Sequence, residues 1–144
     1  MKAIILSLTF TISSMLCAQT TSEADNTIET GTTITVTVPV QSSEGSVLFG
    51  LYDEAGFLQQ PLQSQEGTIK DGKATIVFTD VVPGTYAVSL FHDKNGNKQM
   101  DFDTNGMPLE MYGISNNVMS YGPPQWSDAK FEVSSEPVSL TIRM

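Results

Sequence analysis

A two-residue alternation of apolar and polar side chains recurs along most of the chain and constrains the fold more than any other feature. Between Thr32 and Val40, isoleucine and valine alternate with threonine, which is typical of a strand with one buried face. Residues 46–52 are apolar on both faces, so we expect them in the centre of a sheet. Further strands are predicted over residues 73–78, 85–92, 130–133 and 138–143. No segment has a sustained helical period, and we predict an all-β fold, an antiparallel β-sandwich of about seven strands.

The connections between these strands are predicted from their turn residues. Asp71-Gly72 separates residues 67–70 from residues 73–78, which favours a short hairpin. Residues 53–66 are expected to form a loop. Residues 93–129 are rich in Gly, Asn and Pro and have little strand pattern, so we expect one long loop there. Loops of this length inside a small domain are usually functional.

The first 18 residues have the pattern of a secretory signal peptide. Lys2 supplies the positive charge, residues 3–16 are apolar, and Ala18 is a small residue at the expected cleavage point. Lipid attachment at Cys17 is the alternative, and Leu16 disfavours it because lipoprotein processing needs a small side chain there. We predict export to the periplasm or beyond, a flexible leader over 19–30, and a β-sandwich domain over 31–144. The mature chain would carry no transmembrane segment.

Composition excludes several classes of function. The 144 residues include 7 Lys or Arg and 16 Asp or Glu, a net charge of -9, which argues against nucleic acid as a partner. One Cys and one His exclude a disulfide framework and a Cys-rich zinc site.

The start of the long loop has the oxygen spacing of a calcium loop. Side chains with oxygen recur at alternate positions, and a backbone carbonyl is available at the seventh position. The candidate ligands of Ca²⁺ are Asp93, Asn95, Asn97, Gln99, Asp101 and Asp103. Lys98 stands where an EF-hand loop has Gly, and Thr104 stands where it has a bidentate Glu. Glu110 is a candidate for the missing carboxylate. The alternative is a metal-free loop, because Asp, Asn and Gly are also turn formers.

Other residues near the loop are candidates for ligand binding. His92 precedes the loop and is either a base or ligand, or an anchor that hydrogen-bonds the loop. The aromatic side chains and methionines nearby either face a ligand or fill a small core beneath the loop, and we expect Tyr112 and Trp126 to face inward. The predicted ligand-binding residues are His92, Glu110, Tyr112, Asn116 and Trp126.

The sequence also resembles a bacterial secreted family, domain of unknown function 2141. The residues that carry the resemblance are VPGTYAV (82–88), FHD (91–93), NGN (95–97), Asp101, GMPLE (106–110), YGISNN (112–117) and GPPQWSDAKF (122–131). The resemblance implies export and a sandwich domain, with the His-Asp loop as signature, but no reaction and no substrate. A more distant similarity to prealbumin-like modules rests on one strand and a turn.

Three functions are compatible with these features. The first is an exported, non-enzymatic module that binds a glycan or a protein and has a loop organised by calcium. The second is a structural or assembly component of the cell envelope whose sheet edges pair with a partner. The third is a hydrolase that uses loop carboxylates with His92, although one His and no mature Cys make a catalytic triad difficult to assemble.

Overall fold

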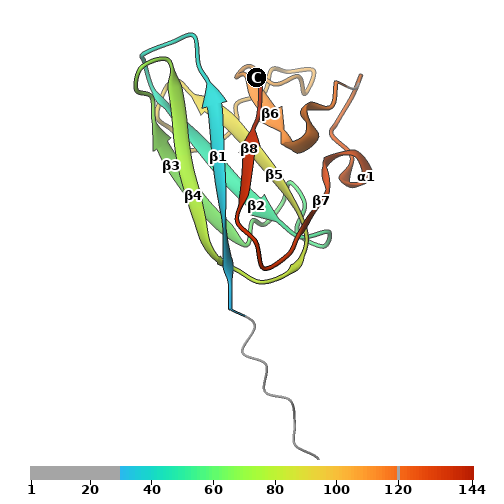
Figure 1. The fold of residues 1–144 in the computed structure, drawn as a ribbon. Helices are drawn as coiled ribbons and strands as arrows, with labels where there is room; N and C mark the ends of the chain where they lie inside the picture. The colour runs from blue at the N-terminus through green and yellow to red at the C-terminus, as the bar shows by residue number, and fades with distance from the viewer. Residues whose placement is uncertain (1–29, 120) are drawn as a thin grey trace, which may run out of the picture.

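Two β-sheets pack face to face in the computed structural model, which describes residues 30–119 and 121–144 (Figure 1). The three-stranded sheet has the order β4-β1-β8, with β4 at Lys73–Val81, β1 at Thr32–Pro39 and β8 at Val138–Thr141. The five-stranded sheet has the order β3-β2-β5-β6, with β3 at Gln63–Thr68, β2 at Ser46–Tyr52, β5 at Gly84–Asp93 and β6 at Tyr112–Ile114. The fifth strand, β7 (Phe131–Val133), also pairs with β5. The prediction of an all-β sandwich is confirmed, and the predicted signal peptide (1–18) and residues 19–29 of the leader lie outside the described residues.

The strand pairs are antiparallel except for β1 and β8, which run parallel from Ile34↔Val138 to Thr37↔Thr141. The chain leaves the five-stranded sheet after β7 and crosses to the other sheet, where it runs along the free side of β1 in the same direction. The C-terminus therefore lies at the same end of the sandwich as the end of β5, and residue 30 lies at the opposite end (Figure 1).

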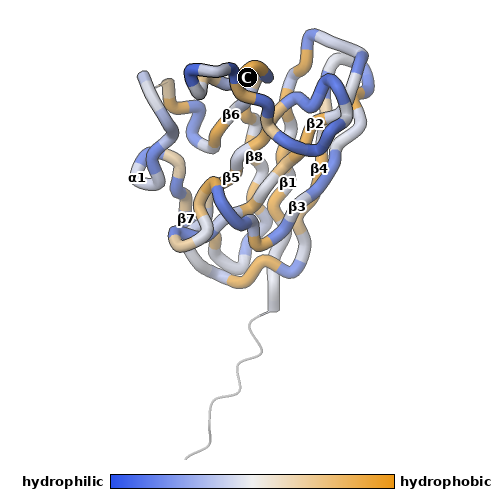
Figure 2. Tube along the Cα trace, turned by 180° about the vertical axis from the view of Figure 1, so that it is seen from behind, coloured by the Kyte–Doolittle hydropathy of each residue, from blue (hydrophilic) through white to orange (hydrophobic). Residues whose placement is uncertain are grey.

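The alternation read in the sequence forms the core. Ile34, Val36 and Val38 of β1 have no exposed surface, and they face the buried side chains of β2 and β5 across the sandwich. Hydrophobic segments accordingly follow β1, β2 and β5, whereas hydrophilic segments dominate the connecting loops (Figure 2). Phe49 and Phe78 are the largest fully buried side chains. The central position predicted for residues 46–52 is confirmed, because β2 lies between β3 and β5.

The predicted hairpin around Asp71-Gly72 is wrong in its partners. The two-residue turn exists, with φ of 53° at Asp71 and 71° at Gly72, and Lys70 pairs with Lys73 across it. However, β3 pairs with β2 and β4 pairs with β1, so the turn carries the chain from one sheet to the other. The loop predicted over 53–66 gives way to β3 at Gln63–Thr68. This edge strand buries only Gly67, against Phe49, so it has no apolar alternation to recognise.

Side-chain amides of β3 cover the open edge of β4. Gln63 donates from Nε2 to the carbonyl oxygen of Thr79 (2.9 Å), and Gln65 donates to the carbonyl oxygen of Val77 (3.5 Å). An open strand edge presents unpaired carbonyls to other chains. The two glutamines therefore occupy part of the edge that strand addition at β4 would use.

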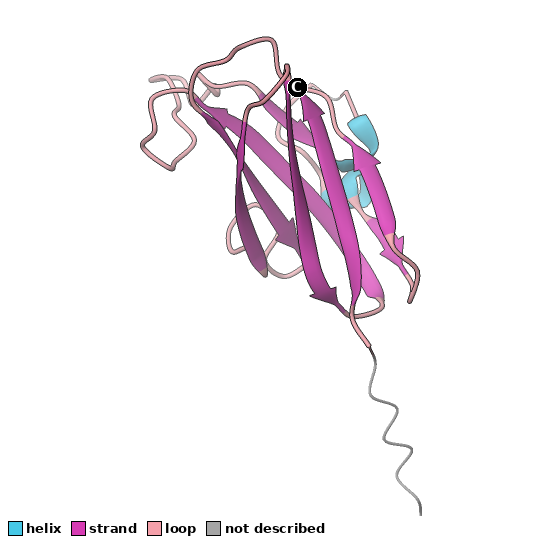
Figure 3. Ribbon diagram, turned by 60° about the vertical axis from the view of Figure 1, so that its left-hand side comes forward, coloured by secondary structure: helices cyan, strands magenta, loops and turns pink. Residues whose placement is uncertain are grey.

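The long loop predicted over 93–129 is interrupted by short elements. The connection after β5 covers residues 94–111, and β6 is followed by a 3₁₀ turn at Ser115–Asn117 and by α1 (Trp126–Ala129). These helical turns lie beside the sandwich (Figure 3). Ala87, Ile114 and Ala129 form a second, small core with Phe57 and Trp126. No helix among residues 30–119 and 121–144 is long and apolar enough to cross a membrane.

Candidate functional site

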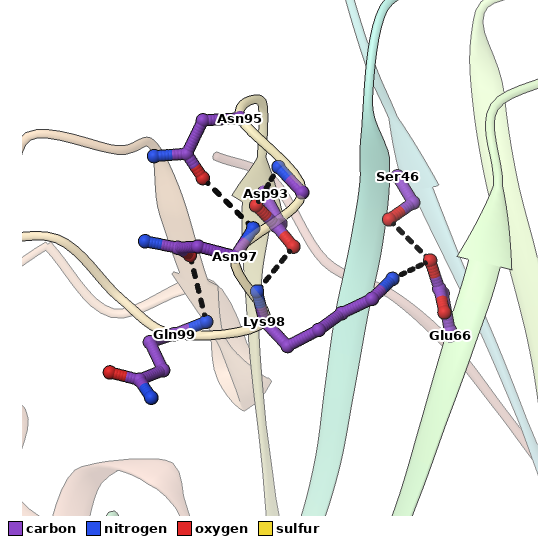
Figure 4. Close-up of polar contacts among 8 residues, drawn as sticks. Ser46, Glu66, Asp93, Asn95, Asn97, Lys98 and Gln99 are labelled. Atoms are coloured by element: carbon purple, nitrogen blue, oxygen red, sulfur yellow. Dashed lines mark hydrogen bonds and ion pairs between the residues drawn. The ribbon is translucent and has the colours of Figure 1, made fainter.

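Asp93, the last residue of β5, holds the first turn of the loop. Its carboxylate is fully buried. Oδ1 accepts a hydrogen bond from the backbone N–H of Gly96 (2.7 Å), and Oδ2 accepts one from the backbone N–H of Lys98 (2.9 Å) (Figure 4). A buried carboxylate needs such donors because desolvation penalises an unpaired charge. The loop is thus folded around this side chain.

Asn95, Asn97 and Asp101 form a polar network above Asp93. The Asn95 oxygen accepts the N–H of Asn97 (3.1 Å), and the Asn97 oxygen accepts the N–H of Gln99 (3.0 Å) (Figure 4). Both amides donate to Asp101, Asn95 to Oδ2 at 2.6 Å and Asn97 to Oδ1 at 2.9 Å. Side chains predicted as ligands from their spacing are therefore brought together.

Glu110 closes the loop from its far end. Its Oε1 accepts the N–H of Lys94 (3.2 Å) and its Oε2 accepts the N–H of Asp101 (3.3 Å). The carboxylate of Glu110 therefore lies beside Asp101, although the two residues are nine positions apart. Asp103 is occupied in a separate turn, in which its Oδ1 accepts the N–H groups of Asn105 and Met107, both at 2.8 Å.

The donor set of the loop suits a hard cation. Carboxylate, amide and backbone oxygens are the ligands that Ca²⁺ prefers, and each loop oxygen of Asp93, Asn95 and Asn97 that accepts one N–H retains a second lone pair. Among residues 30–119 and 121–144, no group of three or more His, Cys, Asp or Glu side chains is arranged to hold a metal. A cation in the loop would therefore depend on amide and backbone oxygens as well as on carboxylates.

Lys98 has the backbone conformation that the calcium-loop pattern requires at this position. Its φ is 63°, in the left-handed region where an EF-hand has Gly. The ammonium group is directed to β3, where it donates to Glu66, and Ser46 also donates to Glu66 (2.7 Å) (Figure 4). The positive charge of Lys98 is thereby paired outside the loop rather than set among its oxygens.

The contact between Lys98 and Glu66 predicts a pH dependence of stability. Hydrogen bonds from Lys98 and then from Ser46 lower the pKa of Glu66 from its ordinary value of 4.5. A carboxyl whose pKa is lowered by folding stabilises the protein above its unfolded pKa, and this contribution is lost as the pH falls through the lowered value. We therefore expect Glu66→Gln to be less stable than the wild type at neutral pH, by a small amount because the pair is exposed.

Urea unfolding of both proteins at neutral pH and at successively lower pH below 4.5 measures this difference. It should shrink to zero as Glu66 of the wild type becomes protonated. A difference that stays constant across the acidic range would contradict the assigned cause.

His92 anchors the loop to the connection between β1 and β2. The side chain is buried, and its Nε2 donates to the carbonyl oxygen of Glu44 (2.7 Å). The Nζ atom of Lys94 lies 3.9 Å from the side-chain carboxylate of Glu44. This is the structural alternative predicted for His92, and it leaves Nε2 committed to the backbone.

The residues after β6 have structural partners that the sequence does not reveal. Ser115 is fully buried, donates to the carbonyl oxygen of Ala129 (2.5 Å) and accepts the N–H of Val88 (3.0 Å). Asn116, a predicted ligand residue, donates to the carbonyl oxygens of Asp128 and Lys130. Asn117 donates to the carbonyl oxygen of Thr141 and accepts the N–H of Arg143. The one signal of this arrangement in the sequence is the pair Asn-Asn, because asparagine tolerates the positive φ that both residues adopt.

The inward orientation predicted for the aromatic side chains is half right. Trp126 is half-buried and packs edge-on against Phe57, with ring centroids 5.6 Å apart. Tyr112 is 37% exposed. Met107, Met111 and Met119 do not fill a small core beneath the loop, because all three are exposed.

These features define a β-sandwich domain with an Asp/Asn/Gly-rich loop folded around its own carboxylate and amide oxygens. The chain belongs to the bacterial family described as "Uncharacterized protein conserved in bacteria (DUF2141)", which matches residues 34–141. The resemblance inferred from the sequence motifs is confirmed. No curated protein and no solved structure matches the chain.

Proposed function

We propose that the protein is an exported, non-enzymatic binding module whose loop after β5 is organised by Ca²⁺. The ligands would be the side chains of Asp93, Asn95, Asn97 and Asp101, with the carbonyl oxygen of Gln99. The observation that carries the proposal is the convergence of this polar network at the end of β5, where apolar packing does not account for the fold of the loop.

Two further features support calcium over a metal-free loop. Lys98 adopts the left-handed backbone of the EF-hand position and pairs its charge with Glu66. Glu110 accepts the backbone N–H groups of Lys94 and Asp101, so the two ends of the loop are held together around the proposed ligands. Asp103 is left out of the proposed ligand set because both of its N–H donors come from the following turn.

A role in binding fits the remaining chemistry better than catalysis. His92 is the one histidine of the chain, and its Nε2 is bound to the carbonyl of Glu44, so it is poorly placed to move a proton. The carboxylates of the loop accept hydrogen bonds from its own backbone and from the amides of Asn95 and Asn97. The signal-like pattern of residues 1–18 supports export, where millimolar calcium is available to sites of low affinity.

Envelope assembly by strand addition is the weaker candidate. The edge of β4 is partly covered by Gln63 and Gln65, and such covering protects an edge from pairing with another chain. The edge of β4 is therefore poorly suited to pair with a strand of a partner.

Calcium is expected to raise the thermal stability of the domain. With a dissociation constant of about 10⁻⁴–10⁻³ M, 10 mM Ca²⁺ should stabilise the folded state by roughly 1.5–3 kcal/mol, or several degrees in Tm. Differential scanning calorimetry in calcium and in EDTA measures the shift, with Mg²⁺ as a competing ion.

A pair of matched variants assigns the shift to the loop. Asp101→Asn removes a proposed ligand charge and should abolish most of the shift. Asp71→Asn makes the same change in the β3–β4 turn, at a positive φ of 53° that Asn tolerates, and should leave the shift intact. An equal Tm in calcium and in EDTA for the wild type would refute the calcium proposal.

A further inference from the structure

Exposed apolar side chains gather in one part of the chain. Twelve large hydrophobic side chains are exposed among the described residues, and eight of them lie between residues 102 and 121. Single exposed apolar residues are ordinary, but a concentration of them marks an interaction site. The site end of the sandwich, at the loop after β5, therefore carries a surface that the calcium proposal does not explain.

The strongest part of this surface is a stripe of three exposed apolar side chains in the segment that leads to β6. Met107, Leu109 and Met111 are exposed by 65%, 66% and 60%. Glu110 between them is turned inward to the backbone of Lys94 and Asp101. This one segment therefore holds the polar loop through Glu110 and presents the apolar side chains of its neighbours to solvent.

Two open grooves continue the stripe on either side of the C-terminal residues Arg143 and Met144. The groove next to the loop has a volume of about 520 Å³ and is lined by Leu109, Met111 and Val40. The groove next to β6 has a volume of about 420 Å³ and is lined by Tyr112, Val118 and Met119. Arg143 and Met144 line both, so they lie at the junction.

Arg143 is the one arginine of the chain and is exposed at this junction. Among residues 30–119 and 121–144, its guanidinium forms no ion pair, unlike the ammonium group of Lys94, which lines one of the same grooves and pairs with Glu44. In a chain with 16 acidic residues, an unpaired guanidinium between apolar grooves is suited to a carboxylate brought by a partner. Asp128 lines the groove next to β6 and would repel a run of acidic residues.

We propose that this docking surface, formed by Leu109, Met111, Tyr112, Arg143 and Met144, binds an extended peptide segment in which one carboxylate is flanked by apolar side chains. The proposal deepens the proposed function by naming the partner of the binding module, and it rests on that function. Methionine side chains adapt to varied apolar partners, and the two grooves meet at Arg143 and Met144, which suits an extended segment that lies along both. The alternatives are an amphiphilic lipid and a second copy of this chain, and the net charge of -9 disfavours the second copy by mutual repulsion.

The test uses a blocked, fluorescently labelled pentapeptide, Leu-Val-Asp-Val-Leu, in an anisotropy titration against the exported protein. We expect saturable binding that weakens by about tenfold when Lys replaces Asp in the peptide, and by a similar factor in Arg143→Gln, since a charge-assisted pair is lost. Leu109→Ser with Met111→Ser should weaken binding by at least about tenfold. Lys73→Gln removes a positive charge at the start of β4, outside both grooves, and should bind as the wild type does.

Several outcomes would overturn the proposal. One is that the Asp peptide shows no saturable binding, and another is that the Lys peptide binds equally well. A third is that the Arg143→Gln variant binds the peptide as the wild type does. A fourth is that the protein binds dodecanoate saturably without binding the peptide. Formation of a dimer that is lost in the Leu109 and Met111 double variant would assign the surface to a second copy instead.

Titrations in calcium and in EDTA separate the two proposals. Peptide binding without a calcium-dependent Tm supports the docking surface alone. A calcium-dependent Tm without peptide binding refutes the docking surface alone.

Discussion

Asp93→Ala is expected to lower the free energy of unfolding by about 3 kcal/mol in the presence of EDTA. The carboxylate of Asp93 is fully buried and accepts the N–H groups of Gly96 and Lys98. Alanine removes both hydrogen bonds, and a hydrogen bond to a charged group contributes roughly 1.5–3 kcal/mol. Urea unfolding monitored by circular dichroism measures the change, and EDTA removes any contribution from calcium.

Asp53→Ala provides the matched comparison. Asp53 is half-buried and accepts a single backbone N–H, from Gly56 (2.8 Å), so its removal should cost only about 1 kcal/mol. Asp93→Asn should fall between the two alanine variants, because the amide keeps one acceptor and sets an N–H against the other donor. If Asp93→Ala cost no more than Asp53→Ala, the loop would be held by something other than this carboxylate.

The strands that could be predicted from the sequence are those that bury one face. In β1 and β4 the alternation of residues such as Ile34, Val36 and Phe78 reflects burial directly. β3 could not be predicted because its one buried residue is Gly67, and its other contacts are polar amides reaching β4. The parallel pairing of β8 with β1 depends on how the chain crosses between the sheets, and local pattern carries no information on that.

The polar residues of the candidate site were predictable because their spacing is local. Asp93, Asn95, Asn97 and Asp101 lie within nine positions, and their mutual contacts follow from turns that such residues favour. The partner of Lys98 was not predictable, since Glu66 is 32 positions away and comes from another strand. The outward orientation of Met107 and Met111 was also missed, because a methionine pattern is equally compatible with a small core and with an exposed surface.

Gly45→Ala is expected to destabilise the domain by at least about 3 kcal/mol and to weaken the calcium response. Gly45 has a φ of 75°, and a Cβ atom there would lie 2.3 Å from the carbonyl oxygen of Asp93 and 2.9 Å from the Cα of Lys94. The neighbouring Glu44 accepts the hydrogen bond from His92. Any shift that relieves the clash therefore displaces the base of the loop or breaks this anchor. Urea unfolding, with and without calcium, measures both effects.

Gly72→Ala separates the cost of the close contact at Gly45 from the cost of a positive φ. Gly72 has a similar φ of 71°, but the nearest atom to a Cβ there is 3.7 Å away, so the substitution should cost only the roughly 1–2 kcal/mol of a left-handed L-residue. The excess cost of Gly45→Ala over Gly72→Ala then measures how tightly the connection between β1 and β2 is packed against the end of β5. Equal costs would mean that this connection moves freely, and the rigid base on which the proposed calcium loop depends would be absent.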